Sequence, residues 1–157
     1  MVQIKKFRLE LVKESNTRYD LEDKRVGSPC DLHKIGNLLF NFDLQAEEVF
    51  SIVTLDTKNN VTGAFEVSRG ALNGSIVHPR EVFKRAILQN ASSIALMHNH
   101  PSGDPKPSSE DLQITKRLEE AGEILGISIL DHIIFGDDYF FSFKEEGLIW
   151  WNSYFLS

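Results

Sequence analysis

Short apolar runs and alternating apolar and polar positions predict β-strands along much of the chain. Near the start, Phe7, Leu9 and Leu11 alternate with charged residues, which predicts a half-buried strand over residues 7–11. Further strands are predicted at 49–56, 61–68, 92–97, 127–135 and 139–143, with turn residues at 58–60 and 136–138. The run at 92–97 is short, mainly apolar and bounded by polar residues, which is typical of a buried strand.

Three segments carry helix-start signals followed by the spacing of an amphipathic helix. In the first, Ser28 can cap the helix, Pro29 follows it, and Asp31 falls in the first turn. Its apolar stripe is Leu32, Ile35, Leu38 and Leu39. A second helix begins at His78-Pro79, with Val82, Phe83, Ala86 and Ile87 facing inward, and a third spans 109–125 before Gly126. Strands alternating with helices indicate an α/β fold, in which a mixed, curved sheet is flanked by helices.

The length of 157 residues suits one domain of ordinary size. We expect a strand and polar loop over residues 1–25, the α/β domain over 26–149, and an aromatic tail over 150–157. Trp150 and Trp151 in that tail either close the core or dock a partner or a second copy of the chain. A homo-oligomer is therefore left open.

Charge and composition narrow the function classes. The net charge of −6 argues against tight nucleic-acid binding by this chain alone. The single cysteine, Cys30, rules out internal disulfides, and we expect a buried, inert thiol there. Residues 1–14 lack the apolar stretch of a signal peptide, and no apolar run is long enough to span a bilayer. A cytoplasmic protein without membrane contact is expected.

The most informative motif is His98-x-His100, seven further residues, Ser108, two more residues and Asp111. Both histidines end a predicted strand and, being two residues apart, point the same way. The proline-rich turn 101–107 returns the chain toward them, and Asp111 falls in the first turn of the next helix. Two histidines and a carboxylate leave one coordination position open on zinc, which is typical of a catalytic site.

Other interpretations remain for single members of this set. Ser108 and Asp111 also match a capping box, which begins helices for structural reasons alone. His132, next to Asp131 in an apolar strand, is either a hydrogen-bonded core residue or a residue that orients a metal ligand.

A hydrolytic zinc site also needs a base. We expect Glu66, which lies on a predicted strand face between the small residues Ala64 and Ser68. The alternatives are that Glu66 is simply solvated, and that Glu110 serves as the base.

Three stretches carry a resemblance to a known family: His98 to Asp111, Leu130-Asp131-His132-Ile133-Ile134, and Val77-His78-Pro79-Arg80-Glu81. They resemble the RadC family, a bacterial branch of the JAMM/MPN-plus metalloproteins. The resemblance implies an MPN (JAB)-like fold and a zinc ion bound by His98, His100 and Asp111. It also implies that Ser108 steadies the water or the developing oxyanion, and that Glu66 is the general acid and base. Longer family members carry a helical domain before this unit, which this chain is too short to contain.

These observations together favour a zinc metallohydrolase. The resemblance makes a peptide or isopeptide bond the expected substrate, as in a JAMM-type metalloprotease. Two alternatives remain: a DNA-repair or DNA-processing protein of the RadC type, and a non-catalytic protein-interaction module.

Overall fold

The computed structural model describes residues 2–16, 24–70 and 77–149. Its centre is a five-stranded mixed sheet with the strand order β2-β1-β3-β4-β5. The strands are β1 (Val49–Leu55), β2 (Val61–Arg69), β3 (Ser93–Asn99), β4 (Ser128–Phe135) and β5 (Phe140–Ser142). Only β3 and β4 pair in parallel, since the helix between them carries the chain back across the sheet. β1 pairs antiparallel with both β2 and β3.

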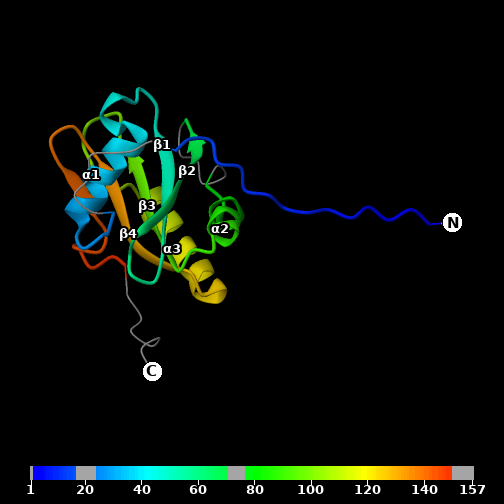
Figure 1. Ribbon diagram of the computed structural model, residues 1–157. Helices are drawn as coiled ribbons and strands as arrows, with labels where there is room; N and C mark the ends of the chain where they lie inside the picture. Colours follow the sequence, from blue (N-terminus) through cyan, green and yellow to red (C-terminus); the bar gives the residue numbers. More distant parts are fainter. Residues whose placement is uncertain (1, 17–23, 71–76, 150–157) are drawn as a thin grey trace.

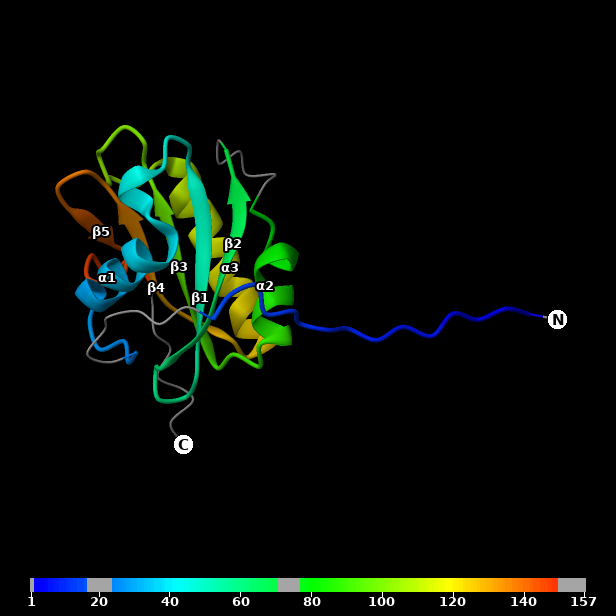
Figure 2. The same ribbon diagram turned by 45° about the horizontal axis from the view of Figure 1, so that its top comes forward.

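Helices cover both faces of this sheet (Figures 1 and 2). Helix α1 (Pro29–Phe40) lies on one face, and α2 (Pro79–Leu88) and α3 (Ser109–Leu125) lie on the other. A short 3-10 helix, η1 (Phe42–Leu44), follows α1. The α/β fold predicted from the sequence, a mixed sheet flanked by helices, is confirmed.

The sheet separates two apolar cores. The α3-side core joins α2 and α3 to alternate strand residues. Its members include Phe50, Leu96 and Ile134 from the strands, and Val82 and Leu118 from the helices. The α1-side core joins α1 to the strand residues in between. Its members include Val49, Met97 and Ile133 from the strands, and Leu32 and Ile35 from the helix. Because neighbouring residues of β1, β3 and β4 enter different cores, these strands are buried on both faces, as their apolar runs predict.

The predicted strand at residues 7–11 does not form in the described chain. Residues 2–16 run extended and away from the sheet in both views (Figures 1 and 2), and Phe7 and Leu9 are 83% and 82% exposed. An alternating pattern predicts a face but supplies no neighbour for the backbone N–H and C=O groups. The described residues offer this segment no strand partner.

Smaller differences concern individual side chains. Leu38 and Ile87, which we expected to face inward, are exposed. Cys30 is exposed and not buried, because it follows Pro29 in the first turn of α1 on the solvent side. The predicted last strand is shorter, and Trp150 and Trp151 lie outside the described residues. None of the described helices is both long and apolar enough to cross a bilayer.

Candidate metal centre

Four potential metal-ligating side chains meet at one end of the sheet: Glu48, His98, His100 and Asp111. His98 is in β3, and His100 lies just beyond the end of that strand. Asp111 comes from the first turn of α3, and Glu48 immediately precedes β1. The antiparallel pairing of β1 with β3 places Phe50 opposite His98, so the start of β1 lies beside the end of β3.

The nitrogen and oxygen atoms of this group converge on one point. His98 Nε2 lies 3.0 Å from His100 Nε2 and 3.2 Å from Asp111 Oδ1. His100 Nε2 lies 3.3 Å from Asp111 Oδ2. Glu48 Oε1 is farther out, 3.8 Å from His98 Nε2 and 4.0 Å from His100 Nε2. The donors are therefore arranged as a compact set of three with a carboxylate beside it.

Burial and mutual contacts shift the pKa values of these side chains. The side chains of His98 and Asp111 are 0% and 2% exposed, whereas His100 and Glu48 are 15% and 20% exposed. Burial alone would raise the pKa of Asp111, but its contacts with the rings of His100 and His98 outweigh burial and hold this pKa far below its ordinary value. For His100, burial lowers the pKa, and its contacts with Asp111 and the Asp104 carbonyl raise it overall. Positive charge is thus favoured at this point, as a cation site requires.

The ring of His100 is held by the proline-rich turn. Its Nδ1–H donates to the backbone oxygen of Asp104 at 2.8 Å, and because a carbonyl can only accept, Nε2 of a neutral ring carries the lone pair. The turn itself rests on the β4–β5 connection, where Asp137 N donates to the Gly103 oxygen. A Cβ on Gly136 would come within 2.5 Å of that same oxygen, so only glycine allows this close approach.

Ser108 caps α3, as the capping-box interpretation expects. Its Oγ accepts from Asp111 N at 3.1 Å and also lies 2.8 Å from Asp111 Oδ2. The Ser108 backbone N–H donates to the same Oδ2 at 2.7 Å. These bonds orient the Asp111 carboxylate toward the histidines, so the capping box and the metal set are one arrangement.

His132 packs directly behind His98. Its Nε2 lies 2.8 Å from His98 Nδ1, and its Nδ1 lies 2.7 Å from the Thr115 hydroxyl. Burial, followed by the charge of His98, holds the pKa of His132 well below its ordinary value. Asp131 does not contact this ring; its carboxylate accepts from the His132 backbone N–H instead. His132 therefore contacts a metal-site histidine directly, without an acid as its partner.

The side chain of Asn99 holds the backbone on both sides of Glu48. Its Oδ1 accepts from Val49 N at 2.8 Å, and its Nδ2 donates to the Glu47 oxygen at 3.0 Å. Asn99 is 3% exposed, and its bond with Val49 N is buried, whereas its bond with the Glu47 oxygen is partly buried. They set the position of Glu48 relative to the strand that carries His98.

We expect Asn99→Ala to lower the free energy of unfolding by about 2 kcal/mol, because it leaves a buried N–H and a carbonyl without partners. Urea unfolding measures this, with Asn16→Ala in the exposed N-terminal chain as the control. An unfolding free energy equal to that of the control would show that water or a backbone shift replaces both bonds.

Glu66 is not brought to this group. Its carboxylate accepts from Arg69 Nε at 3.0 Å and from Nη2 at 2.8 Å, and Arg69 also donates to Gln45 near η1. Its neighbours Phe65 and Val67 pack against the α3-side core. Because alternate strand residues point to opposite faces, Glu66 points to the α1 side, away from Asp111. Glu110 is also outside the group; it is exposed and accepts from Ser109 Oγ.

Glu48 was missed in the sequence. It lies just before a buried strand, as the histidines lie at the end of another, and this placement is its only local signal. Glu48 meets the histidines because those two strands pair antiparallel, and the local sequence pattern does not predict which strands pair.

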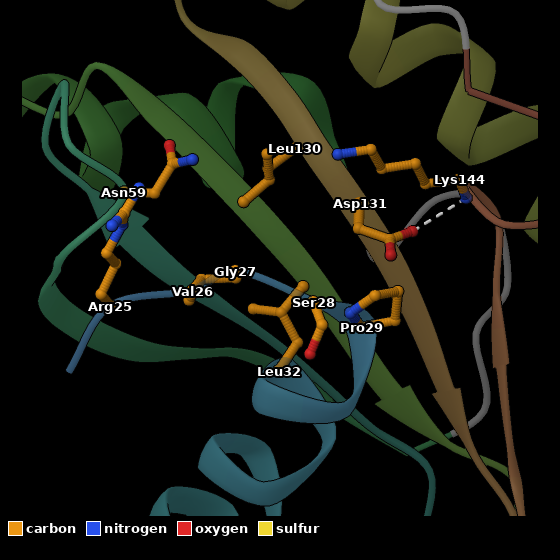
Figure 3. Close-up of a pocket in the computed structure, with 10 residues that line it drawn as sticks. All are labelled: Arg25, Val26, Gly27, Ser28, Pro29, Leu32, Asn59, Leu130, Asp131 and Lys144. Carbon is orange, nitrogen blue, oxygen red and sulfur yellow. Dashed lines mark hydrogen bonds between the residues drawn. The ribbon is translucent and has the colours of Figure 1, made fainter. Parts of the chain in front are cut away.

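A separate hollow of about 190 Å³ lies on the α1 side, near the N-terminus of α1 (Figure 3). Its lining includes Arg25, Asn59, Lys144 and the buried carboxyl of Asp131. Asp131 Oδ2 accepts from Ser142 Oγ at 2.7 Å, and Oδ1 accepts from Lys144 N at 3.0 Å. The N-terminus of α1 is closed by a capping box of Ser28 and Asp31. These groups support the fold on the face opposite to the metal centre.

Burial raises the pKa of Asp131 above its ordinary 3.8, although hydrogen bonds from Ser142, Lys144 N and His132 N oppose the shift. An acid with a raised folded-state pKa holds its proton more tightly in the folded chain. Its contribution to stability is therefore full below pH 3.8 and is lost as the pH rises through the folded-state pKa.

We expect Asp131→Asn to remove this dependence, because an amide does not titrate. Urea unfolding of both proteins from about pH 3.5 to 7 measures the unfolding free energy of wild type minus that of the variant. That difference should fall with rising pH and then level off. A difference that stays constant or grows would contradict the prediction.

Comparison with known proteins places these residues in a family. Residues 28–148 match the model of the RadC-like JAB domain. Among curated relatives, a "UPF0758 protein" of Desulfitobacterium hafniense is 47% identical over 142 residues, which are 90% of this chain and 61% of the relative. One of Alkaliphilus oremlandii is 48% identical over 141 residues, or 90% of this chain and 60% of the relative.

One of Trichlorobacter lovleyi is 58% identical over 103 residues, which cover 66% of this chain and 45% of the relative. The chain thus spans about three fifths of the length of the first two relatives. The family match covers most of the chain and includes all four residues of the candidate metal centre. The chain therefore belongs to the family of RadC-like JAB domains.

Proposed function

We propose that this domain is a zinc-dependent hydrolase that cleaves amide bonds in peptides or isopeptides. The observation that carries the proposal is the convergence of His98 Nε2, His100 Nε2 and the Asp111 carboxylate, with Glu48 beside them. Two imidazole nitrogens and a carboxylate form a donor set that suits zinc and leaves a coordination position open. The residues present therefore fit the ion, and His98, His100 and Asp111 would hold it.

When bound, zinc would polarise the substrate carbonyl and make water a stronger acid. The protein's own part is proton transfer. Oε1 of Glu48 would accept the proton of the attacking water and return it to the leaving nitrogen. Its position 3.8 Å from His98 Nε2 and its partly exposed side chain support this role. In this proposal Glu48 replaces Glu66, which faces the other side of the sheet.

Ser108 has two proposed tasks. Its hydrogen bonds with Asp111 support a positioning role for the carboxylate. Its position at the N-terminus of α3, where backbone N–H groups point outward, also supports the expected stabilisation of a developing oxyanion.

The test is a substrate screen with zinc-loaded protein. Peptide, isopeptide and single-stranded DNA substrates are incubated with wild type and with the Glu48→Gln variant. Amide cleavage that requires both zinc and Glu48 supports the proposal. Cleavage of DNA alone would favour the DNA-processing alternative, and failure to bind zinc would refute the metal site itself.

A further inference from the structure

Two buried residues without a role in the proposed mechanism, Thr115 and His132, connect Asp111 to the ring of His98. Thr115 Oγ1 lies 2.6 Å from the backbone oxygen of Asp111 and 2.7 Å from His132 Nδ1. His132 Nε2 lies 2.8 Å from His98 Nδ1. Thr115, His132 and His98 are at most 1% exposed. The three contacts thus form one continuous chain in the protein interior.

The number of available hydrogens determines which atom donates and which accepts in each of these three hydrogen bonds. Each contact is short enough to need one hydrogen between its heavy atoms, because two facing lone pairs would repel. The Asp111 carbonyl can only accept, so the Thr115 hydroxyl donates to it, as helical threonines often do to the residue four positions before. Thr115 Oγ1 then has no hydrogen left, so it must accept from His132 Nδ1–H.

The same count continues through the two rings. The fully buried His132 is neutral, because an imidazolium would lose its hydration there, and a neutral ring carries one N–H. With that hydrogen on Nδ1, His132 Nε2 holds a lone pair and accepts from His98 Nδ1–H. The lone pair of His98 is then on Nε2, the atom that faces Asp111 and His100. A cation bound between the two Nε2 atoms would take the place of the hydrogen that their 3.0 Å contact otherwise needs.

The opposite arrangement shows why direction matters. If Thr115 donated to His132, the His132 hydrogen would move to Nε2 and be donated to His98 Nδ1. His98 would then carry its hydrogen on Nε2 and could not bind a cation there. The tautomer of His100 is determined by the Asp104 carbonyl, which can only accept. The partner of His98 is an imidazole, which can donate or accept, so the tautomer of His132 must itself be fixed by a further partner.

We propose that Thr115 and His132 are positioning residues that hold His98 in the tautomer whose Nε2 lone pair faces the metal position. The inference rests on the metal site of the proposed function but not on the hydrolysis. Partners of this kind typically change metal affinity by roughly 10–100-fold.

Nitrogen-15 NMR of the histidine rings in metal-free wild-type protein tests the tautomer directly. We expect His98 and His132 both to carry hydrogen on Nδ1. A wild-type His98 with its hydrogen on Nε2 would overturn the inference. Because this measurement needs neither metal nor substrate, it decides the inference even if the protein proves not to be a hydrolase.

Zinc affinity provides the second measurement, by competition with a chelating indicator. Thr115→Val keeps the side-chain shape but removes the hydroxyl, and should weaken zinc binding about tenfold and shift His98 hydrogen toward Nε2. Thr115→Ser keeps a hydroxyl at this position, so its zinc affinity should stay within about threefold of wild type, well below the roughly 10–100-fold loss expected when the partner is removed. The control, His78→Asn, changes a histidine that caps α2 away from the site. Equal affinity in Thr115→Val and wild type would overturn the inference.

Discussion

Replacing Glu48 by glutamine is expected to lower the rate of amide hydrolysis by roughly 10²–10⁴-fold while zinc stays bound. Glutamine keeps the size of the side chain but cannot accept a proton from water. The matched control is Glu66→Gln, which should leave the rate within about twofold, since that carboxylate pairs with Arg69 on the other face. Both rates are measured on whichever substrate the screen identifies.

The pair of variants separates the two glutamates. A loss of activity in Glu66→Gln with Glu48→Gln unaffected would restore the assignment made from the sequence. Loss of zinc from Glu48→Gln would make Glu48 a ligand and not a base.

Replacing His98 by alanine is expected to abolish stoichiometric zinc binding, with an affinity loss above the roughly 100-fold seen when only an outer partner is removed. His98 is completely buried and contributes the nitrogen closest to both other donors. Elemental analysis of protein purified without chelator measures the zinc content, with His78→Asn as the control.

Secondary structure should survive both this substitution and chelation, because the two apolar cores hold the sheet without the four donors. Circular dichroism measures this. Full zinc content in His98→Ala would refute the site, and global unfolding on chelation would make the zinc structural instead of catalytic.

The helices and strands around the site could be predicted from short stretches of sequence, because residue type and spacing within a few positions determine them. Ser28 and Ser108 cap their helices with an acid three residues on, as the pattern predicts. The apolar runs of β1 and β3 are buried on both faces. The spacing from His98 to Asp111 also predicted that these side chains meet, since a strand end, a proline-rich turn and a helix start lie within one short segment.

The position of Glu48 depended on strand pairing. Glu48 and His98 are 50 residues apart in the chain and meet because β1 pairs antiparallel with β3. Local alternation also predicted that Glu66 points to the opposite side of the sheet from its apolar neighbours, and it does so. It could not tell that the candidate metal centre lies on the same side of the sheet as those apolar neighbours.

The position of His132 also could not be predicted from the local pattern, because it depends on strand register. The register of β3 with β4 shifts between Ile94 and Ala95, so that Ile94 pairs with Ile129 but Ala95 pairs with Asp131. One residue of β4 is thus inserted, and Leu130 enters the α1-side core while His132 reaches His98 on the α3 side. Strict alternation from Ile129 would have turned His132 toward the α1 side.

The sequence by itself determined which segments form strands and helices, where the helices begin, and which histidines and aspartate can share an ion. These features depend on contacts within a few residues, where side-chain type and spacing decide the outcome. Only the tertiary structure decided which glutamate joins them, which ring supports His98, and that residues 7–11 have no strand beside them in the described chain. Those outcomes depend on strand register and sheet face, where one inserted residue exchanges the two sides.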